Sequence, residues 1–215
     1  MEKRYESDMT RKEKRQNELK KLKSMTFKQK AAYIWEYYKG VFAGIIIACV
    51  IISIGVQMFQ NSQLKSLLSI VVVDSNYNHD EQVEALQNDF LAYAGTGDKH
   101  EVVDVDTSLL SGDDYNAVVK MTVVMGAGTA DMMFCGEETY KKYKQQEAFL
   151  SWKEILGDDY SKYEEYMTDD GRLDLEKCPN WEKYNMVYYS PVYAVVMSSS
   201  KNLENCIKFL EMMVQ

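Results

Sequence analysis

The sequence has few residues that bend a chain sharply and few that perform common catalysis. Only 2 of its 215 residues are proline, 11 are glycine and 2 are histidine. This composition excludes collagen-like chains and Pro- or Gly-rich disordered chains. The histidines, His79 and His100, form no H-E-x-x-H motif, and the glycines near residue 126 lack the Lys-Ser/Thr of a phosphate-binding loop. We therefore expect no cofactor, no metal site, no catalytic residues and no enzymatic activity.

Charge is missing from one long stretch of the chain. No Asp, Glu, Lys or Arg occurs between Lys39 and Lys65, and residues 41–59 are almost entirely apolar. A helix of about 20 apolar residues spans the ~30 Å hydrocarbon core of a bilayer. We therefore expect residues 40–62 to form a single transmembrane helix.

The segments on either side of this stretch carry opposite charge. Residues 1–40 contain 12 Lys and Arg against 6 Asp and Glu, whereas residues 65–215 contain 13 against 27. Basic flanks stay on the cytoplasmic side of a membrane. We expect a single-pass protein of the cell membrane, with a cytoplasmic N-terminus and an extracellular C-terminal domain. A cleaved signal peptide is disfavoured because its basic region is short and ends at a small-residue site, which this chain lacks.

The 4 cysteines form no C-x-x-C pair. Cys49 follows Ile-Ile-Ala, as in the lipidation motif of bacterial lipoproteins, but the apolar run continues beyond it. An ordinary membrane-helix residue is therefore favoured, and lipidation stays open. Cys135, Cys178 and Cys206 are expected to be buried thiols, with one disulfide as the alternative.

The N-terminal part divides into two segments. Residues 1–25 form a basic cytoplasmic tail, which sets the topology and can also attract anionic lipid at ~1 kcal/mol per basic residue. Residues 26–39 are expected to form a juxtamembrane amphipathic helix, opened by Thr26 and Gln29 as a capping box. Aromatic and basic residues suited to the membrane interface follow: Tyr33, Trp35, Tyr37, Tyr38 and Lys39. With no recognition fold beside the charge, no nucleic-acid partner is expected.

Residues 63–215 are expected to form one α/β domain with a mostly parallel sheet. Apolar runs predict parallel strands at 67–73, 101–105 and 131–135, with 192–197 in the same sheet and a further strand-like run at 184–189. Helical spacing predicts helices at 80–93, 113–125, 137–146 and 202–213. The β-α-β-α-β order favours right-handed crossovers.

Several segments of this domain resemble extracellular solute-binding proteins of ABC importers. They are Gly-Thr-Ala-Asp-Met-Met at 128–133, Ala-Phe-Leu-Ser-Trp at 148–152, and the strand and helix at 192–198 and 202–210. Residues 33–39 are similar to uncharacterised single-pass membrane proteins of Gram-positive (Firmicutes-type) bacteria. The resemblance implies a single lobe of the type II periplasmic-binding-protein fold, whereas solute-binding proteins close two lobes over their ligand.

A binding site is expected where the strands end. In open parallel sheets, ligands lie outside the carboxyl ends of the strands, where loops and helix N-termini converge. The loops expected there carry hydroxyl, amide and carboxylate groups and suit a polar or cationic ligand: Asp74, Ser75, Asn76, Tyr77, Asp106, Thr107, Gly136 and Glu137. Acidic residues at helix N-termini also stabilise the helix dipole, so helix capping alone is the alternative.

Two function classes follow. One is a non-catalytic, membrane-tethered binding domain, a reduced solute-binding-like lobe that serves a ligand or an envelope or transporter partner protein. The other is a structural or accessory subunit of a cell-envelope or transporter complex, with no ligand of its own. A polar cleft at the strand ends favours the first, and an exposed apolar patch favours the second.

Overall fold

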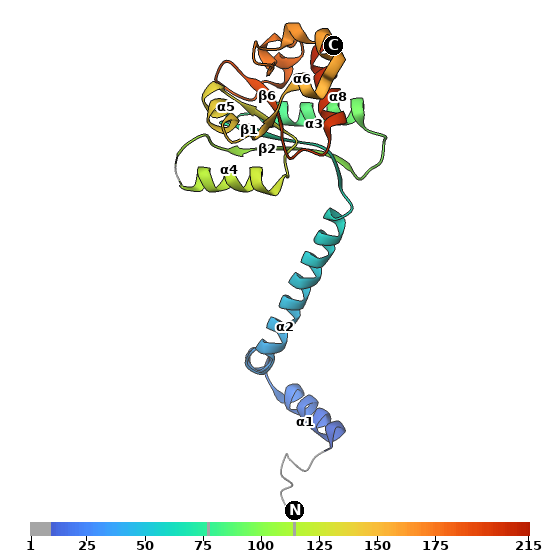
Figure 1. The fold of residues 1–215 in the computed structure, drawn as a ribbon. Coiled ribbons are helices and arrows are strands. Elements are labelled where there is room, and N and C mark those ends of the chain that lie inside the picture. Colours follow the sequence, from blue (N-terminus) through green and yellow to red (C-terminus); the bar gives the residue numbers. More distant parts are fainter. Residues whose placement is uncertain (1–9, 77, 114) are drawn as a thin grey trace, which may run out of the picture. The chain divides into compact units, whose positions relative to one another are not determined.

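The computed structural model describes residues 10–76, 78–113 and 115–215. The chain divides into two compact units, Met1–Ser62 and Gln63–Gln215, which Figure 1 colours from blue to red along the sequence. Each unit has its own architecture.

The first unit consists of two helices. α1 (Arg11–Ser24) begins at Thr10, whose backbone N–H donates to Glu13 Oε2 at 2.9 Å. The segment expected to be a basic cytoplasmic tail, residues 1–25, thus contains a helix. α2 (Phe27–Asn61) begins at Thr26, whose N–H donates to Gln29 Oε1 at 3.1 Å, which confirms the capping interaction expected there.

α2 contains the apolar segment. Its stretch Tyr38–Asn61 is long and apolar enough to cross a membrane and has none of its surface buried within the protein. The expected interface residues all lie in α2, before the apolar stretch or at its first two positions, with Trp35 and Lys39 exposed. The helix is continuous because no proline or glycine pair interrupts residues 27–61.

The second unit is built on one sheet of six described strands: β1 (Lys65–Val73), β2 (Glu101–Leu109), β3 (Met132–Cys135), β4 (Phe149–Leu150), β5 (Leu173–Asp174) and β6 (Tyr193–Met197). The strand order is β2-β1-β3-β6-β4, and β5 also pairs with β6. β1 pairs in parallel with β2 and β3. β6 is antiparallel to β3, β4 and β5.

The sheet is therefore mixed, and the expectation of mostly parallel pairing holds only for β1, β2 and β3. β6 does join the same sheet, as predicted. It runs in the opposite direction because the chain reaches it from a long irregular segment and not through a helical crossover. The expectation of a strand at 184–189 is wrong. Tyr184 ends a short helix, and within this run only Val187 makes an isolated bridge, with Ser75.

Helices cover both faces of the sheet (Figure 1). α3 (Asp80–Ala94) and α8 (Leu203–Val214) pack on the face that carries Leu68, Ile70 and Phe134. α4 (Tyr115–Ala127) and α5 (Glu137–Lys144) pack on the opposite face. The helices predicted at 80–93, 113–125, 137–146 and 202–213 are confirmed, with small shifts of their ends.

The segment between β4 and β6 contains only short elements. Besides β5, they are the α-helices α6 (Trp152–Leu156) and α7 (Trp181–Tyr184) and the 3₁₀ turns η2 (Gly157–Lys162), η3 (Glu164–Tyr166) and η4 (Leu175–Lys177). Trp152 and Trp181 anchor this segment in the core, and Trp152 Nε1 donates to Ala194 O at 2.9 Å. The segment reaches the carboxyl ends of β1 and β3, where the candidate site lies.

Candidate functional site

The loop after β1 joins the ends of β1 and β2. Asp74 has a φ of 52°, a left-handed conformation that Asp tolerates better than most residues. Its N–H donates to Leu109 O at 3.0 Å, and its Oδ1 accepts from Ser111 N–H at 2.9 Å. These bonds hold the Asp74 carboxylate at the carboxyl edge of the sheet.

Ser75, Asn76 and Thr107 come together, as the sequence predicts. Ser75 Oγ donates to Thr107 O at 2.8 Å, and His79 Nε2 lies 2.8 Å from Thr107 Oγ1. Asn76 N–H donates to Met186 O at 2.9 Å. The bonds of Ser75, His79 and Thr107 fix the loop, whereas the buried Asn76 Oδ1 has no hydrogen-bond partner among the described residues. Tyr77 lies outside the described residues.

Asp106 and Thr107 do not lie in a loop. β2 continues to Leu109, well past the predicted end at residue 105, because Asp106 pairs with Val71 and Leu109 with Val73 of β1. An edge strand is half solvated, so alternating polar residues extend it without cost. Asp106 Oδ1 accepts from Ser108 N–H at 2.8 Å.

A cavity of about 360 Å³ opens at the carboxyl ends of β1 and β3. Its lining combines the ends of these strands, the start of α5 and the loop before β6: Asp74, Ser111, Gly136, Glu137, Glu138, Thr139, Tyr188, Tyr189, Ser190 and Pro191. Of the predicted rim residues, Asp74, Gly136 and Glu137 line it. Ser75, Asn76, Asp106 and Thr107 do not.

The loop before β6 forms one wall of the cavity. Tyr189 is largely buried, and its hydroxyl donates to Val73 O at 2.9 Å. Burial raises the pKa of this hydroxyl above its ordinary value, so it stays a donor. Tyr188 is 76% exposed. A side chain at Gly136 would approach Tyr189 Cδ2 to 3.3 Å, so glycine leaves room for the tyrosine ring.

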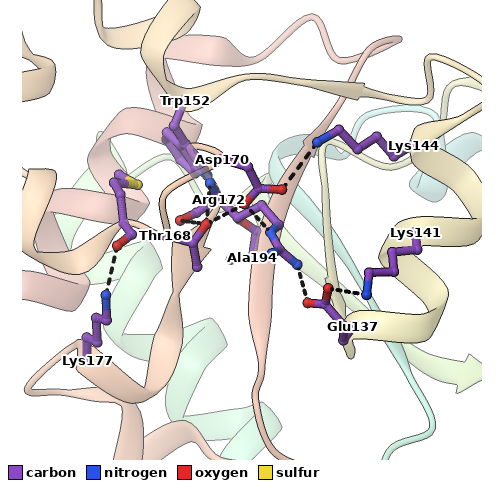
Figure 2. Close-up of polar contacts among 10 residues, drawn as sticks. Glu137, Lys141, Lys144, Trp152, Thr168, Asp170, Arg172, Lys177 and Ala194 are labelled. Atoms are coloured by element: carbon purple, nitrogen blue, oxygen red, sulfur yellow. Dashed lines mark hydrogen bonds and ion pairs between the residues drawn. The ribbon is translucent and has the colours of Figure 1, made fainter.

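Glu137, which lines the cavity, also belongs to an ion-pair network with Arg172 and Lys141 (Figure 2). Its Oε2 lies 2.5 Å from Arg172 Nη1, and its Oε1 lies 3.0 Å from Lys141 Nζ. The hydrogen bonds from Arg172 and Lys141 lower the pKa of Glu137 to about 2. Both carboxylate oxygens are thus engaged, and Glu137 holds the start of α5 in place.

Arg172 is the centre of this network. Its guanidinium lies between the rings of Tyr140 and Tyr193, 4.3 and 4.0 Å from their centroids, and the side chain is 11% exposed. Arg172 Nε also lies 2.7 Å from Asp170 Oδ1.

Asp170 receives further donors, Thr168 Oγ1 at 2.7 Å and Lys144 Nζ at 3.2 Å. Burial opposes ionisation, but the hydrogen bonds from Thr168, Arg172 and Lys144 prevail and lower the pKa of Asp170 to about 2. In the sequence, Asp170-Gly171 is only a turn signal. The arginine that follows it was the available signal, and its partner Glu137 is 35 residues away in the chain.

The arrangement of the cavity suits binding. Its lining includes three carboxylates, from Asp74, Glu137 and Glu138, and no lysine, arginine or histidine among the described residues.

Cys135, Cys178 and Cys206 are free and buried, and burial raises the pKa of each thiol to about 12. Such thiols are poor nucleophiles at neutral pH. Within the described ranges, no three His, Cys, Asp or Glu side chains are placed so that they could hold a metal ion.

Comparisons of the chain with protein-family models, with curated proteins and with solved structures find no match. The similarity of segments 128–133, 148–152 and 192–210 to solute-binding proteins therefore stays a prediction from the sequence.

Proposed function

We propose that the protein is a single-pass membrane protein whose acidic domain lies outside the cytoplasm and binds a polar or cationic ligand without transforming it. The observation that carries this proposal is the position and lining of the cavity at the ends of β1 and β3. Ligands of open α/β sheets bind at this edge.

Charge favours a cationic group over an anionic one. The Asp74 carboxylate and the exposed Glu138 face the cavity, and the nearby basic side chains of Arg172 and Lys141 are already paired with Glu137. Tyr188 offers an exposed ring at the rim, and a cation over such a ring gains ~0.5–1 kcal/mol. An ammonium or guanidinium group, free or on a peptide, fits these groups.

The anchoring part of the proposal rests on α2 and on charge. The apolar stretch Tyr38–Asn61 is exposed along its length, and basic residues precede it. Basic residues on one flank and an acidic domain on the other favour a cytoplasmic N-terminus. The return of β6 between β3 and β4 is in keeping with one solute-binding-like lobe.

The test is thermal unfolding of the full chain in detergent micelles with added ligands. The panel contains diamines, polyamines, arginine, basic dipeptides, sugars and dicarboxylates. A ligand that binds only the folded state stabilises it by about 2.7 kcal/mol at one hundred times its Kd. We expect amines or guanidinium compounds to raise Tm and dicarboxylates to leave it unchanged.

Two variants and two matched controls locate the effect. Asp74→Asn keeps the acceptor for Ser111 N–H but removes the charge, and Tyr188→Ala removes the exposed ring; both should lower the ligand-induced rise at a fixed ligand concentration. Asp104→Asn and Tyr93→Ala remove an exposed carboxylate and an exposed ring elsewhere and should keep it. A rise that is undiminished in both cavity variants contradicts the proposal.

The second candidate, an accessory subunit, is favoured by an exposed apolar face on α4. It predicts no stabilisation by any member of the panel.

A further inference from the structure

α4 presents an apolar outer face to solvent. Its inner side buries Ala117, Met121 and Val124 against the sheet. Its outer side exposes a ridge, which we define as Tyr115, Val118, Val119 and Val123, with exposed fractions from 40% to 81%. The one charged residue in α4 is Lys120, and its ammonium donates to Ser108 O at 3.0 Å. The ridge itself is uncharged.

A groove of about 400 Å³ runs beside the ridge. One wall is α4 and the other consists of α5, the turn after it and the end of β6; its lining residues on α4 are Val118, Thr122, Met125 and Gly126. Lys142 on the opposite wall lies 2.6 Å from Asp113 Oδ1, so its charge is compensated. Ser199 Oγ at this groove is buried and has no hydrogen-bond partner among the described residues.

We infer that the ridge and the groove form a two-fold contact between two copies of this chain. The two features adjoin each other on one helix, so a two-fold axis places the ridge of each copy against the groove of the other. The ridge brings aliphatic groups to a groove whose lining includes the apolar residues Met125, Ala148 and Met197 beside polar ones. A surface that carries both an apolar protrusion and an adjoining recess with apolar residues in its lining can pair with a second copy of itself.

The size of the contact requires a tether. A helix of 13 residues is about 20 Å long, which is short for an interface of ~800 Å² per partner. Attachment to one membrane confines the two copies to one plane and so raises their effective concentration. Only Ser62, Gln63 and Leu64 separate α2 from β1. This step rests on the anchoring proposed above.

The apolar stretch of α2 also carries a surface suited to contact with a second copy. Gly40, Gly44 and Ala48 recur every four residues along α2, and no described atom lies within 4 Å of a Cβ built at either glycine. Small residues at this spacing let two membrane helices approach closely. The stripe favours a second identical chain as the partner.

A lipid surface fits the ridge less well. Membrane-surface helices carry several Lys or Arg on the polar side, whereas α4 has one lysine and belongs to a strongly acidic domain.

The first test is disulfide cross-linking of the full chain in native membranes. In a Cys49→Ala background the remaining cysteines are buried. We expect Val123→Cys to give an oxidised dimer of this chain. Glu84→Cys, exposed on α3 on the other face of the sheet, is the matched control and should stay monomeric. Equal cross-linking at both positions, or none at Val123→Cys, overturns the inference.

The second test is the oligomeric state in micelles. Val123→Glu changes a residue that is 59% exposed, so the fold tolerates it, but the charge would lie inside the contact. We expect its dimer dissociation constant to rise at least about tenfold, a loss of ~1.4 kcal/mol, with an unchanged Tm for the dissociated chain. Val123→Ile should keep the dimer.

Two other results would overturn the inference: a wild-type chain that is monomeric in both micelles and vesicles, or a ridge that binds empty lipid vesicles instead of a second copy. Val123→Glu should still show the rise in Tm caused by the cavity ligand. The thermal shift therefore tests the proposed function, and the oligomeric state tests this inference, independently of each other.

Discussion

Replacing Arg172 by alanine should destabilise the domain strongly at neutral pH. The change removes a nearly buried guanidinium that contacts two carboxylates and two aromatic rings. Breaking a buried ion pair by removing one partner costs ~3–5 kcal/mol. Glu137 and Asp170 are each about one-third exposed, and solvent screens them in part. We therefore expect a loss of about 2–4 kcal/mol at pH 7.

The loss should depend on pH. Both carboxyl pKa values are held at about 2, below their ordinary values of 4.5 and 3.8. A carboxyl group with a lowered pKa stabilises the folded state above its ordinary pKa and loses that contribution as the pH falls toward the folded value. The difference between wild type and Arg172→Ala should therefore shrink between about pH 4.5 and pH 2, leaving ~1 kcal/mol from lost packing on the rings.

Urea unfolding of the full chain in a non-ionic detergent, followed by tryptophan fluorescence at several pH values, measures both effects. Arg172→Lys keeps the charge but not the planar guanidinium, and its loss of stability at pH 7 should be about half that of Arg172→Ala. Lys162→Ala, which breaks an exposed pair with Asp159, should change stability by less than ~0.5 kcal/mol. An Arg172→Ala loss that is equal at pH 7 and pH 2.5 would refute the assignment to charge.

Three further substitutions test the packing of the domain. Asp131→Ala leaves the Ser69 N–H and two side-chain donors without their acceptor. The free energy of unfolding should therefore fall by ~2–3 kcal/mol, which lowers Tm by roughly 4–12 °C. An unchanged Tm would contradict this. Gly128→Ala places a side chain at φ 60° and 3.2 Å from Ser199 Cβ, and urea unfolding should show a loss of ~1–2 kcal/mol. Trp152→Phe removes the buried bond to Ala194 O and should cost ~1–2 kcal/mol by the same assay, whereas a neutral effect would mean that water replaces it.

Helices and strands that depend mainly on neighbouring residues could be predicted from local sequence patterns. The uncharged stretch before Lys65 predicted the apolar helix, and the near-continuous apolar run of β1 predicted a parallel strand. α4 is a helix despite its valines because its buried positions, Ala117, Met121 and Val124, follow helical spacing.

Features set by distant contacts were not predictable. The direction of β6 depends on where the chain emerges from the segment after β4. The apolar run near Val187 has strand-like local character, but β6 already occupies the open edge of β3. The Tyr188–Tyr189 wall and the Arg172 network join parts of the chain that are 35 or more residues apart. Their residue types suggested a turn or a strand, and only the fold brings them to the cavity.

Cysteine labelling in intact cells tests the central claim of a membrane-anchored protein with its binding domain outside. In the Cys49→Ala background, Glu84→Cys should react with a membrane-impermeant maleimide before lysis. Lys12→Cys in the basic N-terminal tail (residues 1–25) should react only after lysis. Both proteins should stay in the membrane fraction after an alkaline wash. Labelling of Lys12→Cys in intact cells, with Glu84→Cys protected until lysis, would contradict the account.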